Sequence, residues 1–103
     1  MRVVFDNKVH LAIQDFYDVA MQRHSTLSYD CVIDKIRRMY ASVESLGSYP
    51  ALYAQARLKE EWIKAGWREY ICEDFHFAYE ICTGDDGEDF VWVRDAVHGM
   101  LYY

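Results

Sequence analysis

The chain has 103 residues, 52% of them hydrophobic and 17% aromatic, which is enough for one domain with a packed core. Its formal net charge of −6 argues against a general nucleic-acid binder, whose affinity depends on neutralising phosphates. No apolar run approaches the roughly 20 residues that cross a bilayer, and the start MRVVFDNKVH lacks the apolar core of a secretory signal. We therefore expect a single cytoplasmic domain over residues 1–103, with no membrane partner.

The charge is unevenly distributed along the chain. Residues 1–68 carry ten Lys and Arg against eight acids, whereas residues 69–103 carry one Arg against nine acids. A local basic patch therefore stays compatible with the acidic total. The cations group in two short segments, which contain Lys35, Arg37 and Arg38, and then Arg57, Lys59, Lys64 and Arg68.

The first half of the chain predicts a short strand followed by two helices. Arg2–Phe5 continues after its first residue with two β-branched valines and a phenylalanine, and Asp6-Asn7 can cap a helix that runs to about Arg23. Its apolar residues recur at spacings of three and four, which is typical of an amphipathic helix.

The second helix is expected over residues 29–46, where seven apolar side chains form one stripe. Ser25 or Thr26 can cap its start, and Gly47 is expected to end it at the C′ position before Pro50. Because the link between the helices is short, they are expected to form an antiparallel hairpin.

Residues 48–66 predict a loop with a short turn of helix, ending at the turn signal Ala65-Gly66. After Gly66 the apolar period changes to two, as expected for strands, with a tight connection at Glu73-Asp74 and a hairpin loop over residues 83–87. The predicted fold class is α+β, a strand, an antiparallel helical hairpin and a three-stranded antiparallel meander, in the order β-α-α-β-β-β, with the meander sandwiched against the hairpin. The place of the first strand in the sheet stays open.

The usual sequence signatures of cofactor and metal chemistry are absent from the chain. There is no GxGxxG, Walker loop, GxSxG or HExxH, and no two histidines are spaced i, i+4. The three cysteines form no CxxC pair and are predicted to be buried thiols. No cofactor and no metal site are therefore predicted.

Cations and phenols gather around the predicted strands. Arg68 begins one strand, Arg94 ends another, and His98 precedes the terminal Tyr102 and Tyr103. If the strands pair as a meander, the two arginines can share a face and grip a phosphate, while an imidazole or phenol transfers a proton. The alternative is structural, because an Arg at a strand end commonly extends to solvent.

The stretch WREYICEDFHFAYEIC, a short acidic hairpin and FVWVRDAVHGMLYY together resemble the C-terminal meander of the RelE/ParE superfamily. These proteins are the toxin halves of bacterial type II toxin–antitoxin pairs, including plasmid-stabilisation systems. The resemblance covers residues 66–103 at the level of side chains, and the whole chain at the level of element order. It implies the same strand, helical hairpin and meander, and an antitoxin that wraps the toxin.

In the RelE-like branch, the resemblance implies ribosome-dependent cleavage of mRNA without a metal, in which the message's 2′-hydroxyl attacks the adjacent phosphate. The residues that match this branch's catalytic positions are Arg68, Arg94, His98 and Tyr102 or Tyr103, and the residues that match its substrate-binding loop lysines are Lys59 and Lys64. In the ParE-like branch the target is DNA gyrase and no residue is catalytic.

Three functions therefore stay open: a translation-coupled endoribonuclease toxin, a non-catalytic ParE-type or degenerate member that binds protein, and an interaction domain without toxicity. Nucleases of the RelE type are usually basic, in contrast to this chain. Both toxin hypotheses expect an exposed apolar groove for an antitoxin helix or strand. Phe16, Tyr17, Met39 and Tyr40 are candidates for this groove, or else for the core.

Overall fold

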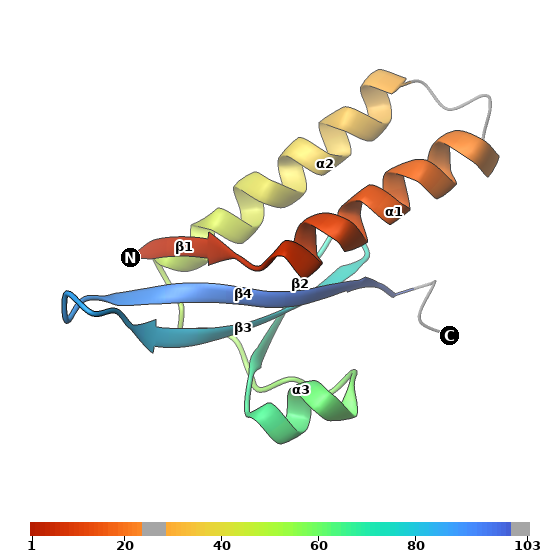
Figure 1. Cartoon of the computed structure of the whole chain (residues 1–103). Coiled ribbons are helices and arrows are strands. Elements are labelled where there is room, and N and C mark those ends of the chain that lie inside the picture. The colour runs from red at the N-terminus through yellow and green to blue at the C-terminus, as the bar shows by residue number, and fades with distance from the viewer. Residues whose placement is uncertain (24–28, 100–103) are drawn as a thin grey trace.

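The computed structural model describes residues 1–23 and 29–99 (Figure 1). The elements in chain order are β1 (Arg2–Phe5), α1 (Asn7–Arg23), α2 (Tyr29–Glu44), the 3₁₀ turn η1 (Ser45–Gly47), α3 (Glu60–Ala65), β2 (Arg68–Cys72), β3 (Phe75–Thr83) and β4 (Asp89–His98). The predicted α+β fold of a strand, two helices and a three-stranded meander is confirmed. The predicted caps Ser25 and Thr26 lie outside the described residues.

The four strands form one mixed sheet in the order β1-β4-β3-β2. β2, β3 and β4 are consecutive antiparallel neighbours, while β1 runs parallel to β4 with Val3 opposite Val91. The first strand thus occupies an edge of the sheet, which the sequence left open. Its parallel direction requires a long crossover, and both helices lie within the chain that connects β1 to β4.

Helices α1 and α2 lie side by side and cover one face of the sheet (Figure 1). The core beneath them is built on the alternate side chains Phe75, Phe77 and Tyr79 of β3, which are all fully buried. Each such side chain stabilises the fold by about 1.5–3 kcal/mol through removal of apolar surface from water. The other buried members of this core are Val9, Ile13, Met39, Val43, Leu46, Val91, Val93 and Ala96.

The short helix α3 lies against the opposite face of the sheet (Figure 1). Its fully buried Trp62 packs with Ala56 and Ala78 in a second, smaller core. The predicted short turn of helix within residues 48–66 is confirmed, and Gly66 ends it in the left-handed conformation with φ 74°. The expected sandwich of meander and hairpin is therefore extended on part of its outer face by a third layer.

Two predicted helix boundaries have different outcomes. Asp6 caps α1, because its Oδ1 accepts the backbone N–H of Lys8 at 3.0 Å. The prediction that Gly47 ends the second helix at C′ is wrong, since the chain continues through it as η1. A Cβ at Gly47 would collide with the carbonyl oxygen of Met1, whose amino group donates to Gly47 O at 3.0 Å. This glycine therefore permits the start of β1 to approach η1.

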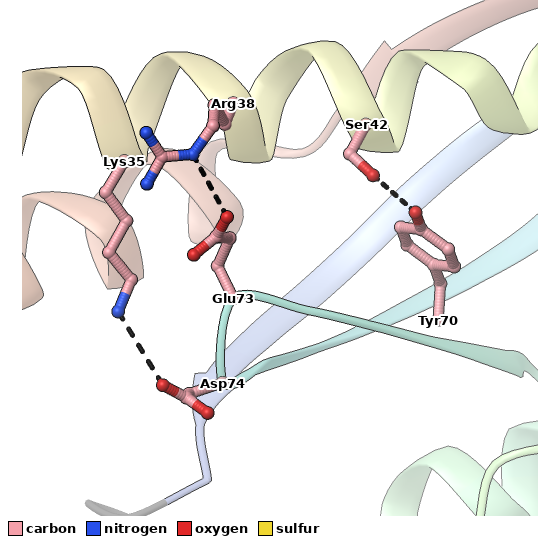
Figure 2. A network of polar contacts seen from close by, with 6 residues as sticks. All are labelled: Lys35, Arg38, Ser42, Tyr70, Glu73 and Asp74. Atoms are coloured by element: carbon pink, nitrogen blue, oxygen red, sulfur yellow. Dashed lines mark hydrogen bonds and ion pairs between the residues drawn. The ribbon is translucent and has the colours of Figure 1, made fainter.

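The two-residue turn between β2 and β3 is strained and clamped to α2. Glu73 and Asp74 have φ values of 51° and 69°, in the left-handed region that non-glycine residues seldom adopt. Arg38 Nε lies 3.1 Å from a carboxylate oxygen of Glu73, and Lys35 Nζ lies 3.7 Å from one of Asp74 (Figure 2). These ion pairs hold the turn against the helical hairpin.

We expect Asp74→Gly to be more stable than Asp74→Ala by about 1 kcal/mol, because both variants lose the carboxylate but only glycine relieves the left-handed backbone. Urea unfolding of the two variants measures this difference. Equal unfolding free energies would show that the turn stores no strain at Asp74.

Candidate functional site

A bulge in β4 determines where the predicted cations lie. Ala78 is opposite Asp95 and Tyr79 is opposite Val93, so Arg94 is an extra residue in the ladder. Both Arg94 and Asp95 therefore project from the face that carries α3. The expectation that Arg68 and Arg94 share a face is wrong, because Arg68 lies opposite Tyr79, which points into the core beneath the helical hairpin.

Arg68 is used to hold the loop before α3. Its Nη1 donates to the carbonyl oxygen of Tyr53 at 2.6 Å, and the neighbouring Tyr79 hydroxyl donates to Pro50 O at 2.6 Å. Burial raises the pKa of Tyr79, which the Arg68 cation partly opposes. The two side chains therefore hold the loop that contains Pro50 and Tyr53 against the sheet.

Arg94 lies among aromatic rings on the opposite face. Its guanidinium carbon is 3.9 Å from the ring centre of Trp92 and 5.2 Å from that of Trp67. Its Nη1 is 3.4 Å from a carboxylate oxygen of Glu80, which neutralises it. Cation–π contacts and a carboxylate together account for the position of this side chain without a ligand.

The two predicted substrate-binding lysines both pair with acids. Lys59 Nζ is 2.6 Å from Glu61 and 3.6 Å from Asp95, and the hydrogen bond to Glu61 is the main cause that raises the pKa of Lys59. Asp95 also accepts the indole N–H of Trp62 at 3.0 Å. Lys64 forms an exposed pair with Glu60 at 3.2 Å. Lys59 therefore anchors α3 to the bulge.

His98 belongs to a separate group at the end of the sheet, here called the turn-end cluster: Phe16, Lys35, Asp74 and His98. The imidazole stacks on Phe16 with ring centres 5.3 Å apart, and Lys35 Nζ is 5.2 Å from the centre of the same ring. Burial lowers the pKa of His98, and the Lys35 cation lowers it further. A neutral imidazole beside an ammonium group can accept a proton from a nearby hydroxyl group.

The structure does not bring Arg68, Arg94 and His98 together. Arg94 is on the other face, and Arg68 and His98 lie opposite residues four positions apart on β3, which is about 13 Å along the strand. Tyr102 and Tyr103 lie outside the described residues, so their predicted role stays a prediction.

One paired group, Glu69 and His76, was not predicted from the sequence. A carboxylate oxygen of Glu69 lies 3.0 Å from His76 Nδ1, and its other oxygen accepts the backbone N–H groups of Arg57 and Leu58, both at 3.3 Å. Strand alternation places both side chains on the α3 face, and this signal was available in the sequence. The pair links β2, β3 and the loop before α3.

A groove of about 330 Å³ runs between α1 and α2 on the surface of the helical hairpin. Of the four candidates for an antitoxin groove, Tyr17 and Tyr40 line it, whereas Met39 is fully buried and Phe16 belongs to the turn-end cluster. The remaining lining residues are His10, Ile13, Gln14, Tyr29, Ile33 and Ile36.

Within residues 1–23 and 29–99, no three His, Cys, Asp or Glu side chains are placed to hold a metal ion together. The prediction of buried thiols is wrong: Cys31 is exposed and Cys72 and Cys82 are half-buried. Cys31 lies in the first turn of α2, next to the buried Val32, and its side chain is exposed to solvent.

None of the helices in the described part of the chain is long and apolar enough to cross a membrane. A scan against protein-family models found no match, and a search of curated proteins found no significant relative.

Arg68→Ala is expected to lower the free energy of unfolding by about 1–3 kcal/mol, because it removes a charged donor from a half-buried carbonyl. Lys64→Ala, which breaks an exposed pair, is the matched control and should change stability by less than about 0.5 kcal/mol. Thermal or urea unfolding checks both. An Arg68→Ala protein as stable as the wild type would contradict the anchoring role.

The depressed pKa of His98 predicts a pH-dependent stability. The unfolded imidazole, with its ordinary pKa of 6.5, binds a proton more readily than the folded one, so stability is complete above pH 6.5 and falls as the pH is lowered through that value. His98→Gln and His98→Phe should both lose less stability than the wild type in this range. Parallel pH profiles of unfolding free energy for all three proteins would contradict the prediction.

Proposed function

We propose that the chain is the toxin component of a type II toxin–antitoxin pair and that it acts by binding a protein target. The toxin class is supported by the resemblance of residues 66–103 to the RelE/ParE meander, together with the order of one strand, two helices and three strands. The groove between α1 and α2 offers apolar and phenolic side chains for an antitoxin segment.

The observation that carries the mode of action is the separation of the cations that a nuclease would need together. Arg68 and Arg94 project from opposite faces of the sheet, and each is already bound to an oxygen of the chain itself. Stabilising a pentacoordinate phosphate requires donors converging on one point. With a formal net charge of −6, the domain also repels RNA at long range. This arrangement favours a ParE-type mechanism, with DNA gyrase as the first target to test.

A second candidate is ribosome-dependent mRNA cleavage, which the turn-end cluster favours. A neutral His98 can take the proton of a 2′-hydroxyl as its oxygen attacks the adjacent phosphorus, while Lys35 offsets the added negative charge. The bond from phosphorus to the 5′-oxygen breaks and this oxygen takes a proton from water, which leaves a 2′,3′-cyclic phosphate and a 5′-hydroxyl. In this scheme the catalytic groups are His98 and Lys35, and Arg68 and Arg94 remain structural.

Induced expression is expected to arrest bacterial growth, and the purified protein is expected to inhibit gyrase supercoiling while leaving message intact in a translating extract. Primer extension maps the message, with His98→Gln and Lys35→Met as variants and Arg37→Met, which removes an exposed cation of the same helix, as control. Harmless induction would overturn the toxin proposal. Ribosome-dependent cuts that vanish in His98→Gln would instead establish the second candidate.

A further inference from the structure

Strand β3 extends well beyond its neighbour β2. β3 has nine residues and β2 has five, and their pairing begins at Arg68 opposite Tyr79. The last four residues, Glu80–Thr83, pair with β4 on one side and have no strand on the other within the described part of the chain. We call this stretch of about 13 Å the open edge.

The direction of the backbone groups along the open edge follows from the ladder. Gly84 N–H donates to Glu88 O at 2.8 Å. Because every second residue of an antiparallel strand bonds to the same neighbour, the N–H and C=O groups of Cys82 and Glu80 also point toward β4. The N–H and C=O groups of Ile81 and Thr83 therefore point outward, and no described residue is hydrogen-bonded to them. They continue the row of groups that Tyr79 presents to β2.

A notch of about 340 Å³ adjoins the open edge where β2 begins. The chain turns away from β3 before Arg68, which leaves the space that a longer β2 would fill. Ile81 borders the notch, and 38% of its side chain is exposed to solvent. The other lining residues are Ala65, Gly66, Trp67, Arg68, Tyr79 and Glu80.

The far end of the open edge is strongly acidic. The loop that follows Thr83 and the start of β4 hold four carboxylates, those of Asp85, Asp86, Glu88 and Asp89. Arg94 is the only cation in the sequence after Arg68, and it pairs with Glu80. A strand added here would therefore run from the notch beside Ile81 toward a cluster of negative charge.

We propose that the open edge is the docking site for an extended basic segment of a partner protein, which adds to the sheet as a strand beside β3. Its backbone satisfies the outward groups of Ile81 and Thr83, an apolar side chain enters the notch beside Ile81, and Lys or Arg side chains face the acidic loop. A second copy of this chain is a poorer occupant, because each copy carries the same net charge of −6. The inference holds whether or not the chain is a toxin.

The probe is the capped pentapeptide Lys-Val-Lys-Val-Lys, titrated into the isotope-labelled protein with amide hydrogen exchange read by NMR. Binding should slow exchange at Ile81 and Thr83 and leave Cys82, which already bonds to β4, unchanged. The acidic peptide Glu-Val-Glu-Val-Glu should produce neither effect. No added protection at Ile81 and Thr83, or equal binding of the acidic peptide, would overturn the proposal.

Ile81→Pro removes the outward donor without touching the β4 ladder and should weaken the basic peptide by about tenfold or more. Ile71→Pro is the matched control on β2. The N–H of Glu69 points away from β3, to Ala54 O at 3.1 Å, so by alternation the N–H of Ile71 also points away from β3. The Ile71→Pro protein should bind the peptide as the wild type does. Circular dichroism and unfolding curves verify that both variants fold.

Asp85→Lys combined with Glu88→Lys reverses two loop charges whose side chains form no hydrogen bond or ion pair within the described residues. The double variant should weaken binding of the basic peptide and flatten its salt dependence. Unchanged affinity would overturn the basic character of the partner. Concentration-dependent dimers that disappear in Ile81→Pro would show that a second copy occupies the edge, and would equally overturn the proposal.

Discussion

One additional residue in β4 determines how both faces of this sheet are used. Without the bulge at Arg94, strict alternation would direct Asp95 into the core beside Phe77 and turn Ala96 toward α3. With it, Asp95 meets the indole N–H of Trp62 and the ammonium group of Lys59, so α3 has a polar anchor next to its buried tryptophan. The same shift returns Ala96 to the core under the helices and places His98 against Phe16.

The sequence predicted the elements well because each has a strong local cause. The change of apolar period after Gly66 marks the meander, and the stripe on residues 29–46 marks α2. The bulge was less visible. Buried residues along β4 change spacing from two to three between Val93 and Ala96, but the neighbouring Val97 is also apolar, so the pattern fits either register. The predicted shared face of Arg68 and Arg94 depended on this one residue.

The cations of the chain are mostly bound by the chain itself, and this determines which chemistry is open to it. Lys35, Arg38, Lys59 and Arg94 each lie within 4 Å of a carboxylate, and Arg68 holds a carbonyl. Pairs that solvent reaches contribute only about 0–1 kcal/mol each, so the main effect of these pairs is on the local electrostatic field. Counting Lys and Arg along the sequence indicates basic clusters, but it does not show that acidic side chains of residues 69–95 lie beside these cations in the fold. A domain neutralised in this way is better suited to a protein partner than to a polyphosphate.

The acidic loop beyond β3 has two consequences for the same edge. An unpaired strand end with an exposed isoleucine is a template for association with any extended chain, including another copy, and proteins commonly protect such edges with charge. Here the protecting charge has one sign. Asp85, Asp86, Glu88 and Asp89 repel a second acidic copy but attract a segment rich in Lys or Arg. The acidic loop that limits self-association therefore also selects the partner. The open backbone groups of Ile81 and Thr83 can pair with any strand, whereas the loop favours a strand that carries positive charge.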